Sequence, residues 1–352
     1  MLAGLQDALK QNPEADITSL LGRDYSRKLE SFQRQAKRQP SSSFDPARYP
    51  VNDIRSRLCT SDEVTVISEL QPEVACLLNN QEPLSEAIVN LLAEAEVLYE
   101  GAAASVVVFR LPNDVAVKIA NEDSLAMEHA SLSYLKEHLP NFPTPKPLGL
   151  VRFGIHCLLF TTFISGLDLE RAWPRLDTSQ KSSISDQLDA LFSELRSLPF
   201  PDNMPLGGVS GDGCKDGRRA IRVSSEPILD VGKLEEFIFS ESKRASPVYT
   251  RLLRSLLPAD KTTKVVFTHA DVRPANIMVD LGDDGAWKVV GVIDWEGSGF
   301  YPECWECVKV TNNLTCLDRF DWYDSLPTCL SPNRYPVGWL LNRVWDWSAE
   351  NG

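Results

Sequence analysis

Short hydrophobic runs interrupted by polar turns dominate the middle of the chain. Four runs rich in β-branched and aromatic residues predict strands, at residues 104–110, 115–120, 148–153 and 156–162. The sequence Leu-Pro-Asn-Asp at 111–114 separates the first two runs, as expected for a hairpin turn. Between the second and third runs, Leu125, Glu128, Leu132 and Leu135 recur at helical spacing. This segment therefore predicts an antiparallel sheet with one helix.

The pattern becomes helical after Gly166. Residues 180–198 have the apolar periodicity of an amphipathic helix, and shorter helices are expected at 233–243 and 247–256. Strands return at residues 264–268, 277–281 and 286–293, with a glycine-rich turn joining the last two. We therefore expect an α+β protein with three parts. These are an N-terminal helical or irregular extension over 1–95, a small antiparallel-sheet lobe over 96–163, and a larger, mostly helical lobe over 164–352.

Composition excludes several classes of function. The 352 residues have a formal net charge of −13, whereas a nucleic-acid binder needs a basic surface to neutralise phosphates. No segment has the roughly 20 apolar residues that a membrane helix needs. The eight cysteines are scattered, which favours reduced thiols over disulfides, and over a zinc site built around Cys304 and Cys307. We expect a cytoplasmic protein, and nothing in the sequence indicates a protein partner.

One polar loop has the composition of a catalytic site. Residues 268–276 read Thr-His-Ala-Asp-Val-Arg-Pro-Ala-Asn between two expected strands, and Asp294 ends the strand after the next turn. Phosphoryl transfer needs a carboxylate to accept the proton of the attacking hydroxyl, oxygen ligands for magnesium and a cation for the phosphate. Asp271, Asn276, Asp294 and Arg273 provide these groups. The alternative is two unrelated, satisfied turns.

This arrangement closely resembles the catalytic loop and metal-binding segment of aminoglycoside-phosphotransferase and choline-kinase-like enzymes, which are distant relatives of protein kinases. The resemblance implies a protein-kinase-like two-lobe fold, ATP and Mg²⁺ as cofactors, and a small-molecule hydroxyl as the acceptor. It implies that Asp271 is the catalytic base, that Asn276 and Asp294 bind magnesium, and that Arg273 contacts phosphate. Ala270 departs from the family pattern, which has glycine before the base.

Lys118 is the expected phosphate-contacting lysine. It lies inside the apolar run 115–120, where a charge is costly to bury without a partner. The resemblance implies a pair with a glutamate on the next helix, with Glu128 as the first choice and Glu122 or Glu137 as alternatives. An exposed lysine on an edge strand is the competing interpretation.

Two further segments are expected to contact the nucleotide. Residues 100–105, which include Gly101 and Ser105, would cover the phosphates, because a glycine and small residues let backbone N–H groups approach them. Thr162, Phe163 and Ile164 precede Gly166 and resemble the linker whose backbone faces adenine. Taken alone, either segment could be an ordinary turn.

The C-terminal part leaves the acceptor open. Residues 206–211 and 299–306 resemble patterns of a large, mostly uncharacterised fungal subgroup of the same family. An acidic, aromatic-walled site for an amine-bearing substrate would use Trp305, Glu306, Asp318, Asp321 and Asp324, and a solvated acidic helix face is the equal alternative. The competing functions are a catalytically inactive nucleotide-binding protein and a protein kinase. The chain lacks the Asp-Phe-Gly and Ala-Pro-Glu segments of the latter.

Overall fold

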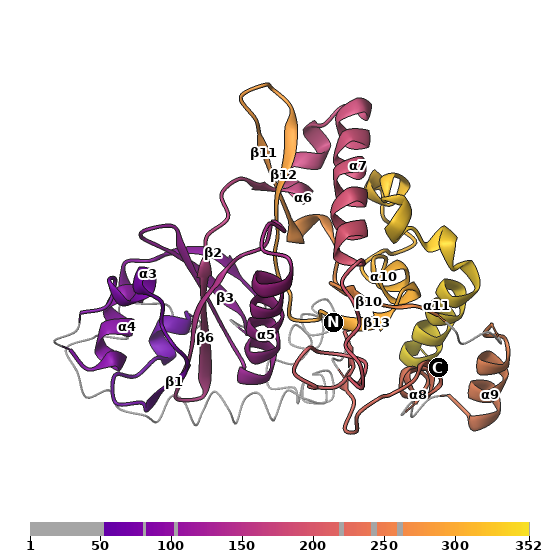
Figure 1. Cartoon of the computed structure of the whole chain (residues 1–352), viewed down its shortest axis with the longest axis horizontal. Helices are drawn as coiled ribbons and strands as arrows, with labels where there is room; N and C mark the ends of the chain where they lie inside the picture. The colour runs from indigo at the N-terminus through magenta and orange to yellow at the C-terminus, as the bar shows by residue number, and fades with distance from the viewer. Residues whose placement is uncertain are drawn as a thin grey trace, which may run out of the picture.

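A six-stranded antiparallel sheet forms the smaller of two lobes (Figure 1). The computed structural model describes residues 53–79, 82–101, 105–217, 222–240, 245–258 and 263–351. The sheet has the order β1-β5-β6-β4-β3-β2. Its strands are β1 (Val64–Ser68), β2 (Glu96–Glu100), β3 (Val107–Leu111), β4 (Val115–Ala120), β5 (Pro147–Phe153) and β6 (His156–Thr162).

Helices cover both faces of this sheet. One face is covered by helix α4 (Leu84–Ala93), the 3-10 turn η3 (Ile54–Arg57) and the short helix α3 (Pro72–Ala75). Their residues Ile54, Val74 and Ile88 share a core with Val117 and Ile119 of β4. On the opposite face, Leu125, Leu132 and Leu135 of α5 (Glu122–His138) pack with Leu159 of β6. Because side chains alternate along a strand, Lys118 of β4 points towards α5.

The sheet begins earlier in the chain than the expected boundary at residue 96. Strand β1 lies within the predicted extension and pairs antiparallel with β5, with Val64 opposite Phe153. Helices α3 and α4 belong to the same lobe because their apolar residues enter its core. The part of the extension that the structure describes is therefore built into the sheet lobe, while residues 1–52 lie outside the described residues.

The larger lobe is mostly helical. Its α-helices are α6 (Leu169–Ala172), α7 (Thr178–Leu195), α8 (Val231–Ile238), α9 (Pro247–Ser255), α10 (Cys304–Lys309) and α11 (Pro336–Asn351). Its 3-10 turns are η5 (Trp173–Arg175), η6 (Pro274–Asn276), η7 (Asp321–Ser325), η8 (Thr328–Leu330) and η9 (Pro332–Arg334). Asp177 and Gln180 form a capping box that starts α7, the long helix beside the projecting hairpin in Figure 1.

Short strands support the segments that carry the predicted chemistry. They are β7 (Leu167–Asp168), β8 (Lys215–Asp216), β9 (Arg222–Val223), β10 (Val265–Thr268), β11 (Ile277–Leu281), β12 (Trp287–Val292) and β13 (Gly299–Pro302). Strands β11 and β12 form the predicted hairpin, and β10 pairs with β13. The loop after β10 and the segment after β12 consequently lie side by side, and the Ile293 N–H donates to the Asn276 carbonyl at 2.9 Å.

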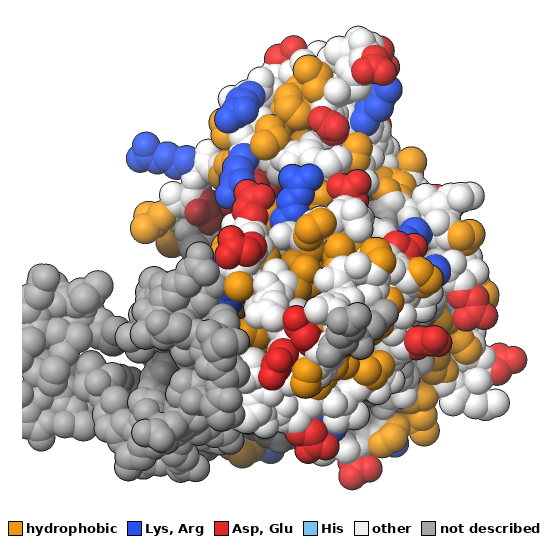
Figure 2. All heavy atoms as spheres, turned by 90° about the vertical axis from the view of Figure 1, so that its left-hand side faces the viewer, with side chains coloured by type: hydrophobic (Ala, Val, Ile, Leu, Met, Phe, Trp, Pro, Cys, Tyr) orange, Lys and Arg blue, Asp and Glu red, His pale blue; other side chains and the backbone are white. Residues whose placement is uncertain are grey.

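Two global features of the described residues concern membrane crossing and surface charge. Within the described residues, no helix combines the length and apolar character that crossing a membrane would require. On the face shown in Figure 2, Lys and Arg side chains are interspersed with Asp and Glu side chains.

Candidate active site

His269 anchors the loop that carries the predicted base. Its ring is fully buried and contacts the edge of Trp295, at a centroid distance of 4.5 Å. The Nε2 atom donates to the Ile293 carbonyl at 2.9 Å, and Nδ1 accepts from the Asp271 N–H at 3.2 Å. Burial lowers the pKa of His269 to about 4, so the ring is neutral at pH 7. These two bonds join the loop of the predicted base to the segment that follows β12.

A buried glutamate accepts hydrogen bonds from the backbone of the same loop. Glu306 of α10 is fully buried and accepts hydrogen bonds from the N–H groups of His269, at 2.6 Å, and Ala270, at 2.9 Å. Burial raises the pKa of Glu306 to about 7, although Arg196 and the two amides oppose the rise. Ala270 has a φ of 66°, in the left-handed region that favours glycine. The glycine that the resembled family has at this position would adopt such a φ without strain.

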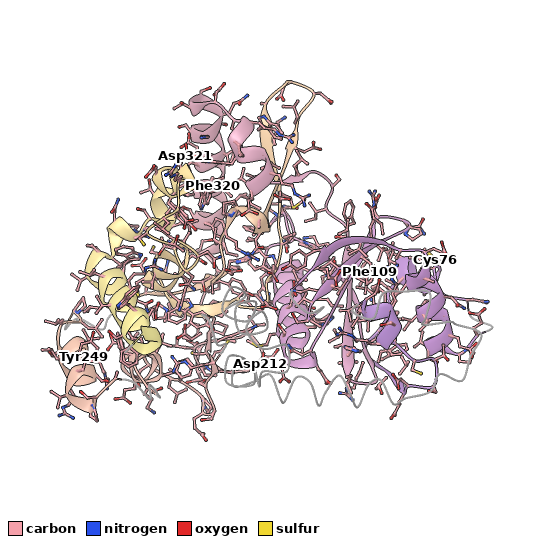
Figure 3. All side chains as sticks on the ribbon, turned by 180° about the vertical axis from the view of Figure 1, so that it is seen from behind. Cys76, Phe109, Asp212, Tyr249, Phe320 and Asp321 are labelled. Carbon is pink, nitrogen blue, oxygen red and sulfur yellow. The ribbon has the colours of Figure 1, made fainter. Side chains whose placement is uncertain are left out.

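Glu306 therefore supports the loop, and the substrate-side interpretation is wrong for Glu306 and Trp305, whose side chains are buried. Trp305 is buried and stacks on Tyr301 at a centroid distance of 5.1 Å. Asp321, labelled in Figure 3 beside Phe320, accepts from Trp173 Nε1 at 2.7 Å and pairs with Lys181 at 2.6 Å. An acid within the apolar run 304–308 was the one sign in the sequence that Glu306 would be buried.

Asp271 lies at the centre of the predicted catalytic groups. The Asn276 amide nitrogen donates to the Asp271 carbonyl at 2.9 Å and to its carboxylate at 3.0 Å. Arg273 Nε lies 3.3 Å from Asp271 Oδ2. That nitrogen is buried and forms no aligned hydrogen bond within the described residues, so the contact is an ion pair only. Burial, followed by repulsion from Asp294, raises the pKa of Asp271 to about 6, while Arg273 and Asn276 act against the rise.

The two lobes meet at Lys118. Its Nζ atom lies 2.8 Å from Glu128 Oε2 on α5 and 2.5 Å from Asp294 Oδ1, which follows β12. Glu128 Oε1 also accepts from the Trp295 N–H at 3.3 Å. Sequence spacing explains the first contact: Glu128 shares a helical face with Leu125 and Leu132, and that face packs against the sheet.

Charge and burial compete at this junction. Burial would lower the pKa of Lys118, but Glu128 and the other carboxylates raise it well above its ordinary value. Burial would raise the pKa of Asp294, yet the Lys118 ammonium makes the net shift downward. Burial raises the pKa of Glu128 against the opposing effect of Lys118. Lys118 and Asp294 are therefore charged, and Asp294 has a left-handed φ of 67° that orients its carboxylate.

Sequence reasoning missed two further residues at this junction. Glu296, two residues after Asp294, accepts a short hydrogen bond from the Ser124 hydroxyl at the start of α5. Lys215 of β8 is buried and donates to the Glu296 carbonyl at 2.9 Å. Lys215 lies 79 residues from Asp294 in a loop whose composition indicated only turns, so no local signal revealed it.

Several backbone amides of the segments predicted to contact a nucleotide have partners within the protein. Gly101 donates to the Val106 carbonyl at 2.8 Å, and Ser105 is exposed, while residues 102–104 lie outside the described residues. The N–H groups of Thr162 and Phe163 already donate to the carbonyls of Lys146 and Asp114, at 3.0 and 2.7 Å. Neither amide can therefore donate to an adenine in this structure. The amide of Ile164 has no such partner within the described residues.

The oxygen atoms of Asp294 and Asn276 are compatible with a magnesium ion whose remaining ligands come from outside the protein. Among the described residues, His, Cys, Asp and Glu side chains form no group of three or more that could hold a metal alone. Asp294 offers a carboxylate, and Asn276 offers its amide oxygen because the amide nitrogen is bonded to Asp271. Mg²⁺ is typically held by one or two such oxygens, with phosphates and water completing its coordination.

Comparisons with known proteins place these groups in context. A family model described as the phosphotransferase enzyme family matches residues 94–323. Among solved structures, a thermostable mutant of aminoglycoside phosphotransferase APH(4)-Ia has a TM-score of 0.50 and 13% identity, covering 75% of this chain and 89% of that chain. Type VIII aminoglycoside-3'-phosphotransferase has a TM-score of 0.46 and 17% identity, with 72% and 92% covered.

A third solved structure is APH(3'')-Id from Streptomyces rimosus, with a TM-score of 0.42, 16% identity, and 74% of this chain and 98% of that chain covered. A search of curated proteins found no match. At 13% identity, the likeness to APH(4)-Ia concerns the fold, and it confirms the predicted α+β, protein-kinase-like two-lobe architecture.

Proposed function

Because the chain belongs to the phosphotransferase enzyme family, matched over residues 94–323, we propose that it is an ATP- and Mg²⁺-dependent kinase that phosphorylates the hydroxyl group of a small molecule. The observation that carries the proposal is the meeting of the two lobes at Lys118, 2.8 Å from Glu128 and 2.5 Å from Asp294. Asp271 lies on the adjoining loop, which supplies the remaining group that phosphoryl transfer needs.

Each residue has a distinct part in the proposed reaction. Lys118 turns from Asp294 to the nucleotide phosphates while Glu128 keeps its amine in place, and Asp294 and Asn276 would hold the magnesium ion. Bound magnesium would neutralise charge on the phosphates. The buried Nε of Arg273, which lacks an aligned partner within the described residues, donates to the transferred group.

Asp271 orients the acceptor and takes its proton. The acceptor oxygen forms a bond to the γ-phosphorus as the bond from that phosphorus to the β–γ bridging oxygen breaks, and ADP leaves. The hydroxyl proton passes to an Asp271 oxygen. A pKa of about 6 leaves Asp271 mostly ionised at pH 7 and gives it more affinity for a proton than an exposed aspartate has.

Two variants separate the proposed roles. Asp271→Asn should abolish phosphate transfer while nucleotide affinity stays within a few-fold, because the base acts on the acceptor. Asp294→Ala should remove the magnesium dependence of nucleotide binding. Asp283→Asn is the matched control, since Asp283 is exposed in the turn of the β11–β12 hairpin.

Activity is followed by ADP release across a set of hydroxyl-bearing metabolites, and binding by the fluorescence of an N-methylanthraniloyl ATP analogue. Near-normal turnover of Asp271→Asn would contradict its role as the base. Nucleotide binding by the unchanged protein without transfer to any acceptor would favour an inactive, nucleotide-binding relative. Absence of nucleotide binding would overturn the proposed function.

A further inference from the structure

The segment that carries Lys215 is held firmly against the larger lobe. Gly207 exchanges two backbone hydrogen bonds with Phe300 of β13, both 2.8 Å long. A Cβ atom on Gly207 would lie 2.1 Å from the Gly213 carbonyl oxygen, so no other residue fits there without a shift of backbone. At the other end of the segment, Asp216 is fully buried and pairs with Lys309 and Arg222.

The same segment also reaches the smaller lobe. A Cβ atom on Gly208 would lie 3.3 Å from the Met127 methyl group on α5 and 3.0 Å from Asp212 Oδ2. Figure 3 shows Asp212 near the foot of α5, between the two lobes. Residues 206–216 therefore connect the helix that carries Glu128 to the lobe that carries Asp294.

Lys215 brings a buried positive charge to this connection. Its side chain is 6% exposed, and its backbone N–H donates to the Tyr301 hydroxyl at 2.9 Å. The Nζ atom donates to the Glu296 carbonyl at 2.9 Å and lies 3.7 Å from Glu296 Oε1. It also lies 3.5 Å from the Ser124 hydroxyl, which donates to Glu296 Oε2. A buried ammonium is costly without such partners.

Glu296 lies between two ammonium groups. Its Oε2 atom is 3.7 Å from Lys118 Nζ, and its Oε1 atom is 3.7 Å from Lys215 Nζ. Lys118 already has Glu128 and Asp294 at closer range. A nucleotide phosphate that binds Lys118 must replace some of these carboxylates. Any movement of Glu296 towards Lys118 would therefore weaken nucleotide binding, because it would add a third close competitor.

We infer that Lys215 is a positioning residue for nucleotide binding. Together with Ser124, it holds Glu296 3.7 Å from Lys118, so that Lys118 can exchange Asp294 for a phosphate. The inference rests on the proposed function, since it assigns Lys118 to the phosphates. Lys215 itself contacts neither nucleotide nor acceptor and acts through Glu296 alone.

The test compares nucleotide affinity in four proteins: the unchanged chain, Lys215→Met, Lys215→Met with Glu296→Gln, and Lys215→Arg. Affinity is measured by titration with the N-methylanthraniloyl ATP analogue, with magnesium and with EDTA. Lys288→Met is the matched control, because Lys288 is an exposed lysine of the β11–β12 hairpin that pairs with Asp284 at 3.0 Å.

We expect Lys215→Met to bind the analogue at least tenfold more weakly, because the freed Glu296 carboxylate turns to Lys118. The double variant should return to within threefold of the unchanged chain, since the amide that replaces the Glu296 carboxylate has no charge with which to compete. Lys215→Arg should retain affinity. In steady-state assays the KM for ATP should rise in Lys215→Met, with kcat within threefold. A purely structural role for Lys215 would not make nucleotide affinity depend on the charge of residue 296.

Several results would overturn the inference. One is a folded Lys215→Met that binds the analogue within twofold of the unchanged chain, and another is a double variant as weak as Lys215→Met. If circular dichroism shows that Lys215→Met does not fold, Lys215→Gln makes the same comparison, since it keeps a donor for the Glu296 carbonyl. Absence of binding by the unchanged chain would overturn the proposed function and this inference together. Binding by the unchanged chain with no effect at Lys215 would overturn the inference alone.

Discussion

The buried ring of His269 leads to a quantitative prediction about how the stability of the folded chain depends on pH. His269 is neutral in the folded protein, with Nε2 as a donor to Ile293 and Nδ1 as an acceptor from the Asp271 N–H. Protonation would place a hydrogen on Nδ1 facing that N–H group and break the second bond. Acidification should therefore destabilise the folded chain through this one ring.

The magnitude follows from the two pKa values. Burial lowers the pKa of His269 from 6.5 to about 4, so the unfolded chain binds a proton that the folded chain does not over that interval. A depressed histidine pKa contributes stability that is present above the unfolded value and is lost as the pH falls. Between pH 7.5 and pH 5.5 the loss is about 1.4 kcal/mol, because each pH unit below 6.5 corresponds to about 1.4 kcal/mol.

Urea unfolding followed by tryptophan fluorescence measures this loss. The range stops at pH 5.5 because the sequence pI is about 4.9 and solubility falls near it. His269→Gln should lower stability at pH 7.5 and reduce the pH dependence by about 1.4 kcal/mol relative to the unchanged chain. His138→Gln, which alters an exposed ring, is the control. Equal pH dependence in His269→Gln and the unchanged chain would refute the neutral, buried state of His269.

Two other predictions concern the support of the same loop. Glu306→Ala should destabilise the fold by about 4 kcal/mol, because it leaves two buried N–H groups without acceptors and removes the charge facing Arg196. The control Glu303→Ala, next to the same helix, should lower the free energy of unfolding by less than about 1 kcal/mol. Equal losses of unfolding free energy in the two variants, measured with urea, would argue against the anchoring role of Glu306. Ala270→Gly should stabilise the fold by about 0.5 kcal/mol, since relief of the left-handed φ outweighs the added freedom of the unfolded chain. The control Ala126→Gly, within α5, should instead lower the free energy of unfolding by about 1 kcal/mol. A loss of stability in Ala270→Gly would show that the Ala270 backbone is unstrained.

Local patterns predicted much of this protein because their causes are local. The β-branched runs around 111–114 and the turn at 282–285 specify two hairpins through backbone preferences that act over a few residues. Lys118 within an apolar strand and Glu128 on a leucine-bearing helix face follow from the strand and helix periodicities, and the structure brings them to 2.8 Å. Asn276 directly precedes the β11–β12 hairpin, Asp294 follows it, and Asp271 lies on the loop before it, so the residues that carry the proposed chemistry could be named from their spacing before any coordinates.

Four features of the protein depend on contacts between segments that are distant in the sequence, and only the tertiary structure revealed them. Strand β1 joins the sheet only by pairing with β5, more than 80 residues away, so its segment was assigned to an extension. The backbone of residues 162–164 was expected to face adenine, and the partners of the Thr162 and Phe163 amides, the carbonyls of Lys146 and Asp114, come from other segments. Glu306 lies against the backbone of the predicted catalytic loop, and Lys215 reaches Glu296 from a segment distant in the sequence. Propensity and spacing describe neighbours along the chain, whereas burial and charge pairing depend on the packing of whole elements, and for that reason these four features appear only in the folded protein.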